Sequence, residues 1–228
     1  MKNKRDLLNN KFYSTIVHIF NFFITNLWFL LFISPFVFYI LYFENISKPV
    51  VLILSITIGP SITTLFSVMG KLLREGEISP TRDFFHYYKL NLLQGLLVGI
   101  ILNILICIIY FDIIYFSSNG QKELVYVMFS LLLVVILLEF YAYPIISRYN
   151  VKILFLFRIS IELLIKKIYI SLTCLAITII CLWLVRFTRI SLIGLLFGAS
   201  VICYLVLKVQ RNTIDNLEDT VKERYKKS

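Results

Sequence analysis

The stretch SITIGPSITTLFSVMGKLLREGEISP, residues 55–80, begins as an apolar segment and ends as a charged loop. It contains Gly59 and Pro60, a pair that normally ends a helix. Inside a bilayer, the backbone groups that a proline frees must find partners in neighbouring helices or side chains. The stretch therefore predicts a membrane helix that is kinked near Pro60 and packs its kinked face against other helices.

Small or weakly polar residues recur every four positions in this segment and again in a later apolar segment, which contains a GxxxG pattern. Stripes of this kind let membrane helices approach closely. Two interpretations stay open: the stripes pack the helices, or they line a polar path between the second and third spans. The stripe residues are Ser55, Gly59, Thr63 and Ser67 in the first segment, where Pro60 is a further candidate, and Asn91, Gly95, Gly99 and Asn103 in the second.

The composition also indicates a membrane protein. Of the 228 residues, 59% are hydrophobic and 16% are charged, whereas soluble domains are about 45–50% apolar and about 25% charged. The net charge of +10 is dispersed among apolar segments, which argues against a nucleic-acid partner. The four cysteines lie in apolar runs without a Cys/His cluster, so we expect neither a metal site nor a cofactor.

Six segments have about the length that a membrane-crossing helix needs. They cover residues 20–43, 50–70, 90–116, 124–143, 168–185 and 190–207. The expected fold is an all-α, polytopic bundle of six transmembrane helices with additional amphipathic helices. We expect residues 1–210 to form the membrane domain and residues 211–228 to form a charged cytoplasmic tail, either disordered or a short solvated helix.

The distribution of basic residues predicts the orientation. If the N-terminus is cytoplasmic, the outer turns hold only Lys48, Lys122, Arg186 and Arg189, and the other 19 of the 23 Lys and Arg residues lie in inner segments. Inner segments of membrane proteins are enriched in Lys and Arg. The sequence thus predicts a multi-pass protein of the cytoplasmic membrane with both termini cytoplasmic.

Few residues suggest chemistry. Glu139 and Asp112 are the carboxylates within the predicted spans, and membrane carboxylates can mark functional sites. The chain has no phosphate-binding loop, no nucleophile motif and no HExxH pattern. We therefore expect a non-catalytic protein whose direct surroundings are the lipid bilayer.

Two amphipathic segments are predicted on the inner side. One begins with Ser79 and Pro80, a helix N-cap and a first-turn proline, and leads into the third span. The other covers residues 150–168 and carries Arg158, Glu162 and Lys166 at intervals of four. Both could anchor the chain at the membrane surface or dock a partner subunit. The candidate docking residues are Arg74, Glu77, Phe84, Phe85, Tyr88, Phe157, Arg158 and Glu162.

Several motifs resemble the YesL family, also called domain of unknown function 624. They are TNLWFL at 25–30, IGPSITTLFSVMGKLLREGE at 58–77, and YPIISRYNVKILFLFRISIELLIKK at 143–167. The resemblance implies a bacterial integral membrane protein associated with carbohydrate ABC importers. It implies no catalytic or binding residues, although Arg74, Gly76, Glu77, Tyr143 and Pro144 match the motifs.

Three hypotheses follow from these observations. The first is an accessory subunit that docks to an ABC-type importer at the cytoplasmic side. The second is a small stand-alone permease or channel with a path between spans two and three. The third is a signalling protein that senses the membrane through its aromatic interfacial helix. The sequence leaves the substrate and the oligomeric state open.

Overall fold

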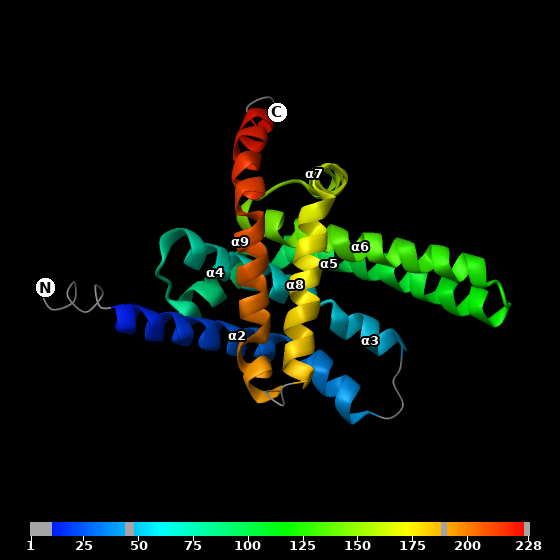
Figure 1. Cartoon of the computed structure of the whole chain (residues 1–228), viewed down its shortest axis with the longest axis horizontal. Helices are drawn as coiled ribbons and strands as arrows, with labels where there is room; N and C mark the ends of the chain where they lie inside the picture. The colour runs from blue at the N-terminus through cyan, green and yellow to red at the C-terminus, as the bar shows by residue number, and fades with distance from the viewer. Residues whose placement is uncertain (1–10, 44–47, 188–190, 226–228) are drawn as a thin grey trace, which may run out of the picture.

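The computed structural model describes residues 11–43, 48–187 and 191–225, and within these ranges it contains helices and short connections but no strand. Figure 1 labels the elements in chain order. The helices are α2 (Lys11–Tyr42), α3 (Lys48–Ser55), α4 (Ile58–Glu75), α5 (Pro80–Ser118), α6 (Lys122–Arg148), α7 (Ile153–Lys166), α8 (Ile168–Phe187) and α9 (Ser191–Tyr225). The all-α class expected from the sequence is confirmed.

Six of these segments are long and apolar enough to cross a membrane, judged by length and composition. They are Tyr13–Tyr42, Ile53–Glu75, Pro80–Ser118, Lys122–Arg148, Ile168–Phe187 and Leu192–Leu217. They match the six predicted spans in number and order, although residue 190, the predicted start of the sixth span, lies outside the described residues. The chain is therefore a multi-pass membrane protein.

The helix break predicted near Pro60 is present. Helix α3 ends at Ser55, a turn follows at Ile56 and Thr57, and α4 then begins at Ile58. Pro60 has no N–H to donate to the carbonyl of Ile56, and it sits in the first turn of α4, where a proline is tolerated. The break thus falls on the N-terminal side of the proline.

The abrupt end of the apolar run also has a physical cause. Helix α4 ends at Glu75 and is capped by Gly76, whose positive φ of 77° suits a glycine and whose N–H donates to the carbonyl of Leu72. Lys71, the first charged residue of this run, donates to both carboxylate oxygens of Asp83 at 2.9 Å. Asp83 also accepts from the N–H of Ser79, the N-cap of α5. This ion pair fixes the turn between α4 and α5.

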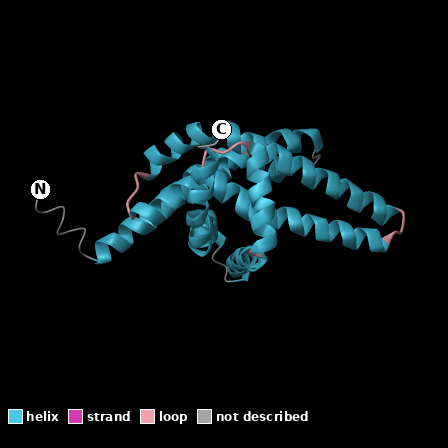
Figure 2. Cartoon of the chain, turned by 90° about the horizontal axis from the view of Figure 1, so that it is seen from above, coloured by secondary structure: helices cyan, strands magenta, loops and turns pink. Residues whose placement is uncertain are grey.

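The long helices form two antiparallel hairpins, α5–α6 and α8–α9, that run in steeply different directions (Figures 1 and 2). The hairpins meet near α4, and their tips lie far apart, one at the right and one at the bottom of Figure 1. We call the region where α4, α6, α7 and α9 meet the convergent end. Because the hairpins diverge from there, their distal halves expose apolar side chains such as Phe111, Tyr126 and Trp183. A lipid environment suits these exposed side chains.

Helix α4 forms the centre of the molecule. Within its candidate span, 67% of the most apolar stretch of 18 residues is buried, compared with 11–22% of the corresponding stretch in each of the other five spans. Its buried side chains include Leu65, Val68 and Met69. The segment that interrupts its helix with a proline is therefore the one most completely surrounded by protein.

The predicted boundary between membrane domain and tail does not coincide with a structural break. Helix α9 continues through residues 210 and 211 as far as Tyr225. Thr213, Ile214 and Leu217 are buried at helical spacing, so the start of the tail packs on the convergent end. The solvated character predicted for the tail is wrong for this part.

Candidate functional site

The predicted stripes of the second and third spans face each other in direct contact. A Cβ added to Gly59 would collide with the carbonyl oxygen of Gly95 and lie 3.0 Å from the Cα of Gly99. A Cβ added to Gly95 would lie 2.9 Å from both the Cα of Pro60 and the Oγ1 of Thr63. The backbones of α4 and α5 therefore touch, and this geometry leaves no room for a path between them.

The polar members of the stripes form hydrogen bonds inside the bundle. Thr63 Oγ1 donates to the carbonyl of Gly59 at 2.9 Å, as expected for a hydroxyl in an apolar helix. Ser67 lies 2.9 Å from the carbonyl of Ser147 on α6 and accepts from Asn91 Nδ2 at 2.8 Å. Asn103 differs: it is only half-buried, and no hydrogen bond of its carboxamide is found among the described residues. The stripe thus ends before Asn103.

A cavity of about 240 Å³ lies on the opposite side of α4. It opens where α6 separates from α8 and α9, and most of its wall is apolar, including Phe29, Phe66 and Ile202. Glu139 of α6 contributes the one carboxylate among the residues that line it. No hydrogen bond or ion pair of Glu139 is found within the described residues. A carboxylate in such a wall suits a ligand that is largely apolar and carries a hydrogen-bond donor or a cation.

The docking residues predicted on α5 are partly used inside the molecule. Phe84 is fully buried and packs against Phe32 of α2, so it belongs to the core and offers no accessible surface. Phe85 is 37% exposed and contacts Trp28 edge to face, and Tyr88 contacts Phe32. The aromatic face predicted for this segment is thus largely covered by α2.

Helix α7 keeps an accessible surface. It buries Leu156, Ile159 and Leu163 against the molecule and exposes the predicted Arg158 and Glu162. Glu162 accepts from Lys166 at 2.7 Å, one turn further along, and Phe157 is half-buried at the edge of the core. In Figure 1, α7 is seen end-on beside the start of α8, so the two helices cross steeply.

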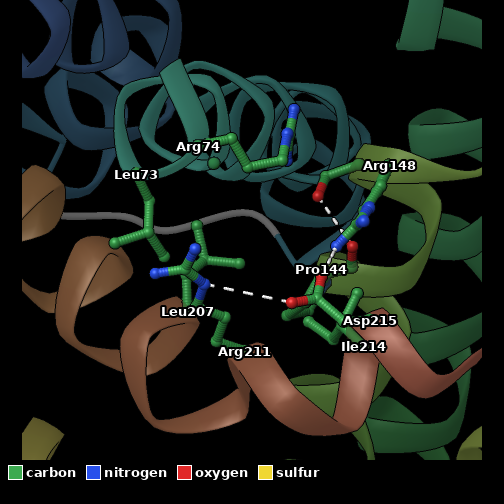
Figure 3. A pocket seen from close by; sticks show the side chains of 10 residues that line it. Leu73, Arg74, Pro144, Arg148, Leu207, Arg211, Ile214 and Asp215 are labelled. Carbon is green, nitrogen blue, oxygen red and sulfur yellow. Dashed lines mark hydrogen bonds and ion pairs between the residues drawn. The ribbon is translucent and has the colours of Figure 1, made fainter. Parts of the chain in front are cut away.

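Three arginines meet at the convergent end around a small pocket (Figure 3). Arg74 comes from the end of α4, Arg148 from the end of α6, and Arg211 from α9. Asp215 is the one carboxylate in the wall of this pocket. It pairs with Arg148 and lies 3.9 Å from the Nε of Arg211. Glu77, which was predicted together with Arg74, is exposed outside this pocket.

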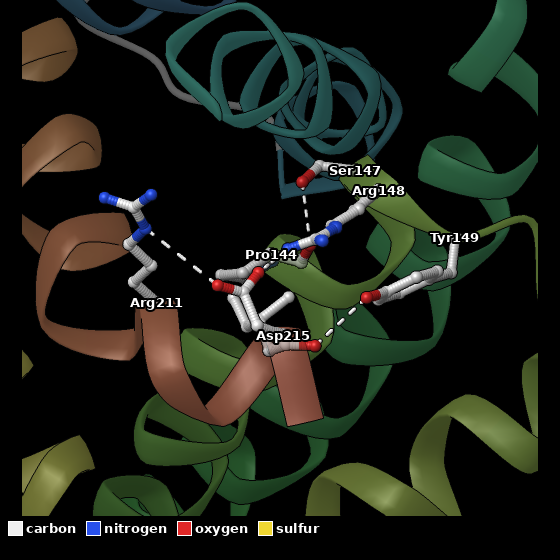
Figure 4. Close-up of polar contacts among 7 residues, drawn as sticks. Pro144, Ser147, Arg148, Tyr149, Arg211 and Asp215 are labelled. Carbon is white, nitrogen blue, oxygen red and sulfur yellow. Dashed lines mark hydrogen bonds and ion pairs between the residues drawn. The ribbon is translucent and has the colours of Figure 1, made fainter. Parts of the chain in front are cut away.

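Hydrogen bonds near the end of α6 stabilise that end and join it to α9, two of the three helices that carry this pocket (Figure 4). Tyr149 Oη donates to the carbonyl of Ile214 at 3.0 Å, and Ser147 Oγ donates to the carbonyl of Pro144 at 2.7 Å. The guanidinium of Arg148 also lies over the ring of Tyr149, 5.3 Å from its centroid. The residues after Tyr143 and Pro144 thus attach α6 to α9.

The sequence did not reveal Arg148, Arg211 and Asp215 as one site. Arg148 and Arg211 were counted only among the basic residues of the inner segments, and Asp215 lies in the segment that was predicted to be a charged tail. Their meeting depends on α9 continuing as a helix past the predicted end of the membrane domain. The periodic spacing of Thr213, Ile214 and Leu217 was the available signal for that continuation.

The geometry also explains the motifs that carry the family resemblance. Asn26 is fully buried: its Nδ2 donates to the carbonyl of Leu195 at 2.7 Å, and its Oδ1 accepts from the N–H of Ser200. Trp28 Nε1 donates to Thr81 Oγ1 at 3.1 Å. Together with the contact at Gly59, these residues hold α2, α4, α5 and α9 together, which is a structural role.

A comparison with known protein families found a match in the first half of the chain. Residues 22–113 match the family model described as "Protein of unknown function, DUF624". The resemblance expected from the sequence is thereby confirmed over this segment. The matched DUF624 segment runs from α2 into α5 and contains the Gly59 contact, Asn26 and Trp28, whereas the Tyr143 and Pro144 motif lies outside it. No curated protein and no solved structure matches the chain.

Proposed function

We propose that this protein is a non-catalytic accessory subunit in the bacterial cytoplasmic membrane that docks to an ABC-type carbohydrate importer from the cytoplasmic side. The observation that carries the proposal is the exposed surface of α7. The family resemblance supports the importer as the partner, and the exposed side chains of α7 support this helix as the docking surface.

Helix α7 has three faces when its residues are placed at 100° intervals. One face, including Leu156, Ile159 and Leu163, is buried against the molecule. The second exposes Leu154, Ile161 and Ile165, of which Leu154 is 88% and Ile165 is 74% accessible. The third carries Arg158, Glu162 and Lys166. A helix with an outward apolar stripe beside a charged stripe can lie in the membrane surface and contact a partner helix there.

The orientation supports a cytoplasmic partner. The outer turns are short and hold four of the 23 basic residues, whereas the convergent end collects the ends of α4 and α6, the whole of α7, and the second half of α9. The positive-inside rule therefore favours a cytoplasmic convergent end and cytoplasmic termini. Reporter fusions after Ser228 test the orientation: activity of a cytoplasmic reporter agrees with it, and activity of an extracytoplasmic reporter contradicts it.

Site-specific photocrosslinking tests the partner. A photoreactive amino acid at Ile165, in cells that express the importer, should give adducts that mass spectrometry assigns to an importer membrane subunit. The same substitution at Leu182, which is exposed on α8 away from α7, is the matched control and should give no such adduct. Adducts with lipid alone from Ile165 would contradict the proposal.

A second candidate function is a small permease, and the cavity beside Glu139 is the observation that favours it. The path would run between α6 and the α8–α9 hairpin, because the contact at Gly59 closes the side between α4 and α5. Flux of a substrate panel into vesicles that contain the purified chain tests this idea. Transport that is lost when Ala199, in the cavity wall, is replaced by Trp would support it; absence of any flux would dismiss it.

A further inference from the structure

The pocket at the convergent end has an unusual charge balance for its size. Its described wall presents three guanidinium groups and one carboxylate, and the remaining wall includes the apolar residues Leu73, Pro144 and Leu207. The side chain of Arg148 is 20% exposed and is held by Asp215, whereas the side chain of Arg211 is 56% exposed. A single carboxylate thus faces three cations from three different helices (Figure 3).

Gly70 contributes to this arrangement. The Nη1 of Arg74 would lie 3.1 Å from a Cβ at position 70, and Leu207 Cδ1 of α9 would lie 3.7 Å from it. The absent side chain therefore leaves space in which the guanidinium of Arg74 folds back by one turn along α4. No ion pair of Arg74 is found among the residues that the structure describes. Its charge is thus available at the pocket mouth.

We propose that the pocket formed by Arg74, Arg148 and Arg211 binds the oxyanion of a phosphate group. Guanidinium groups match the geometry of phosphate oxygens and can donate two parallel hydrogen bonds to them. The enclosed part of the pocket has a volume of about 20 Å³, which suffices for a single oxygen or water molecule. The phosphate therefore lies at the open mouth, with Arg74 and Arg211 as its direct partners and Arg148 behind them.

The phosphate can come from two sources that share this chemistry. One is the headgroup of an anionic lipid, because basic pockets between membrane helices bind such headgroups at the inner surface. The other is a soluble phosphate. Asp215 competes with either, since its carboxylate already occupies the guanidinium group of Arg148 and lies near that of Arg211. The inference does not depend on a partner at α7.

Lipid retention by the purified full-length chain tests the proposal. Native mass spectrometry compares phosphatidylglycerol with phosphatidylcholine, and inorganic phosphate is titrated as a competitor. Arg74→Gln and Arg211→Gln should each weaken binding about tenfold, the effect of losing one charge-assisted hydrogen bond. Arg186→Gln removes the same charge from an exposed position in the last turn of α8, outside the pocket wall, and should leave binding unchanged.

Asp215→Asn separates phosphate binding from a purely structural ion pair. If the pocket binds phosphate, removal of the competing carboxylate should strengthen binding several-fold. Selective retention of phosphatidylglycerol identifies a lipid headgroup as the ligand. Displacement of bound lipid by low concentrations of inorganic phosphate, without a preference between the two lipids, identifies a soluble phosphate. Both outcomes support the proposal. Equal binding by all variants, or weaker binding by Asp215→Asn at unchanged helix content, would overturn it.

Discussion

The two sides of α4 show different ways of holding membrane helices together. On the side of α5, glycines bring two backbones into contact, and the interface is closed. On the side of α8 and α9, α6 separates from its neighbours and leaves a cavity of about 240 Å³. Lipid tails are as apolar as leucine, so helices in a bilayer associate through close packing and hydrogen bonds. The side with glycines is therefore expected to be rigid and the other side adaptable.

The open side depends on a few polar contacts. Asn26 connects α2 with the backbone of α9, and Gln210 Nε2 donates to the carbonyl of Phe140 on α6 at 2.7 Å. Each of these hydrogen bonds joins two helices at a single residue, whereas the glycine contact brings the backbones of α4 and α5 together at several residues. A change in the opening of the cavity would thus require few bonds to break, and motion of the α8–α9 hairpin is the expected result.

The largest effect should come from Gly59→Ala. The new Cβ would collide with the carbonyl oxygen of Gly95, and because this atom belongs to the backbone, α4 and α5 must separate. We expect a loss of about 3 kcal/mol in the free energy of unfolding, measured by circular dichroism during denaturation in mixed micelles. Gly198→Ala, on α9 with nothing within 4 Å of its Cβ, is the control and should stabilise the helix by up to about 1 kcal/mol. Equal effects of the two substitutions would contradict the comparison.

The next effect is expected at the turn that joins the closed pair. Asp83→Asn removes the charge that pairs with Lys71, and the side chains of both residues are mostly buried. An unpaired ammonium group at this position should cost about 2 kcal/mol in unfolding free energy. Glu162→Gln breaks an exposed pair with Lys166 and should cost less than about 0.5 kcal/mol. A small effect of Asp83→Asn would show that the glycine contact alone holds the turn.

A smaller effect should follow from loss of a hydrogen-bonded tie on the open side. Asn26→Leu removes both bonds from α2 to the backbone of α9, and we expect a loss of about 1.5 kcal/mol. Asn103→Leu changes a half-buried carboxamide for which the described residues provide no hydrogen bond, and it should be neutral or slightly stabilising. Denaturation of both variants under the same conditions makes the comparison, and a greater loss for Asn103→Leu would refute it.

The closed side was predictable from sequence, and the open side was not. The stripes of Gly59 and Gly95 are visible along single helices, because residues four apart share a face. The cavity combines residues of several helices, and nothing in the sequence around Ala199 or Cys203 indicates which helices are neighbours. The amphipathic pattern placed Phe84 on the apolar face of its helix, but the sequence did not show that α2 covers this face. The prediction of a solvated tail relied on the charge of that segment and did not take account of the helical spacing of Thr213, Ile214 and Leu217, which are buried.

The smallest effect should come from Glu139→Gln, and it should have the opposite sign. A carboxylate in an apolar wall loses hydration, and no partner within the described residues compensates for that loss. Glutamine has the same shape without the charge. If the cavity serves only to separate the hairpins, Glu139→Gln should raise the free energy of unfolding by about 1 kcal/mol.

Asp112→Asn is the matched control for this prediction. Asp112 lies on α5, outside the cavity wall, and is half-buried, so its replacement should change stability by less than about 0.5 kcal/mol. Both variants would be denatured in the same micelles and their transition midpoints compared. A lower stability of the Glu139→Gln variant would show instead that the carboxylate forms favourable contacts in the membrane. In that case the open side would be held by charge as well as by hydrogen bonds, and its adaptability would depend on what Glu139 binds.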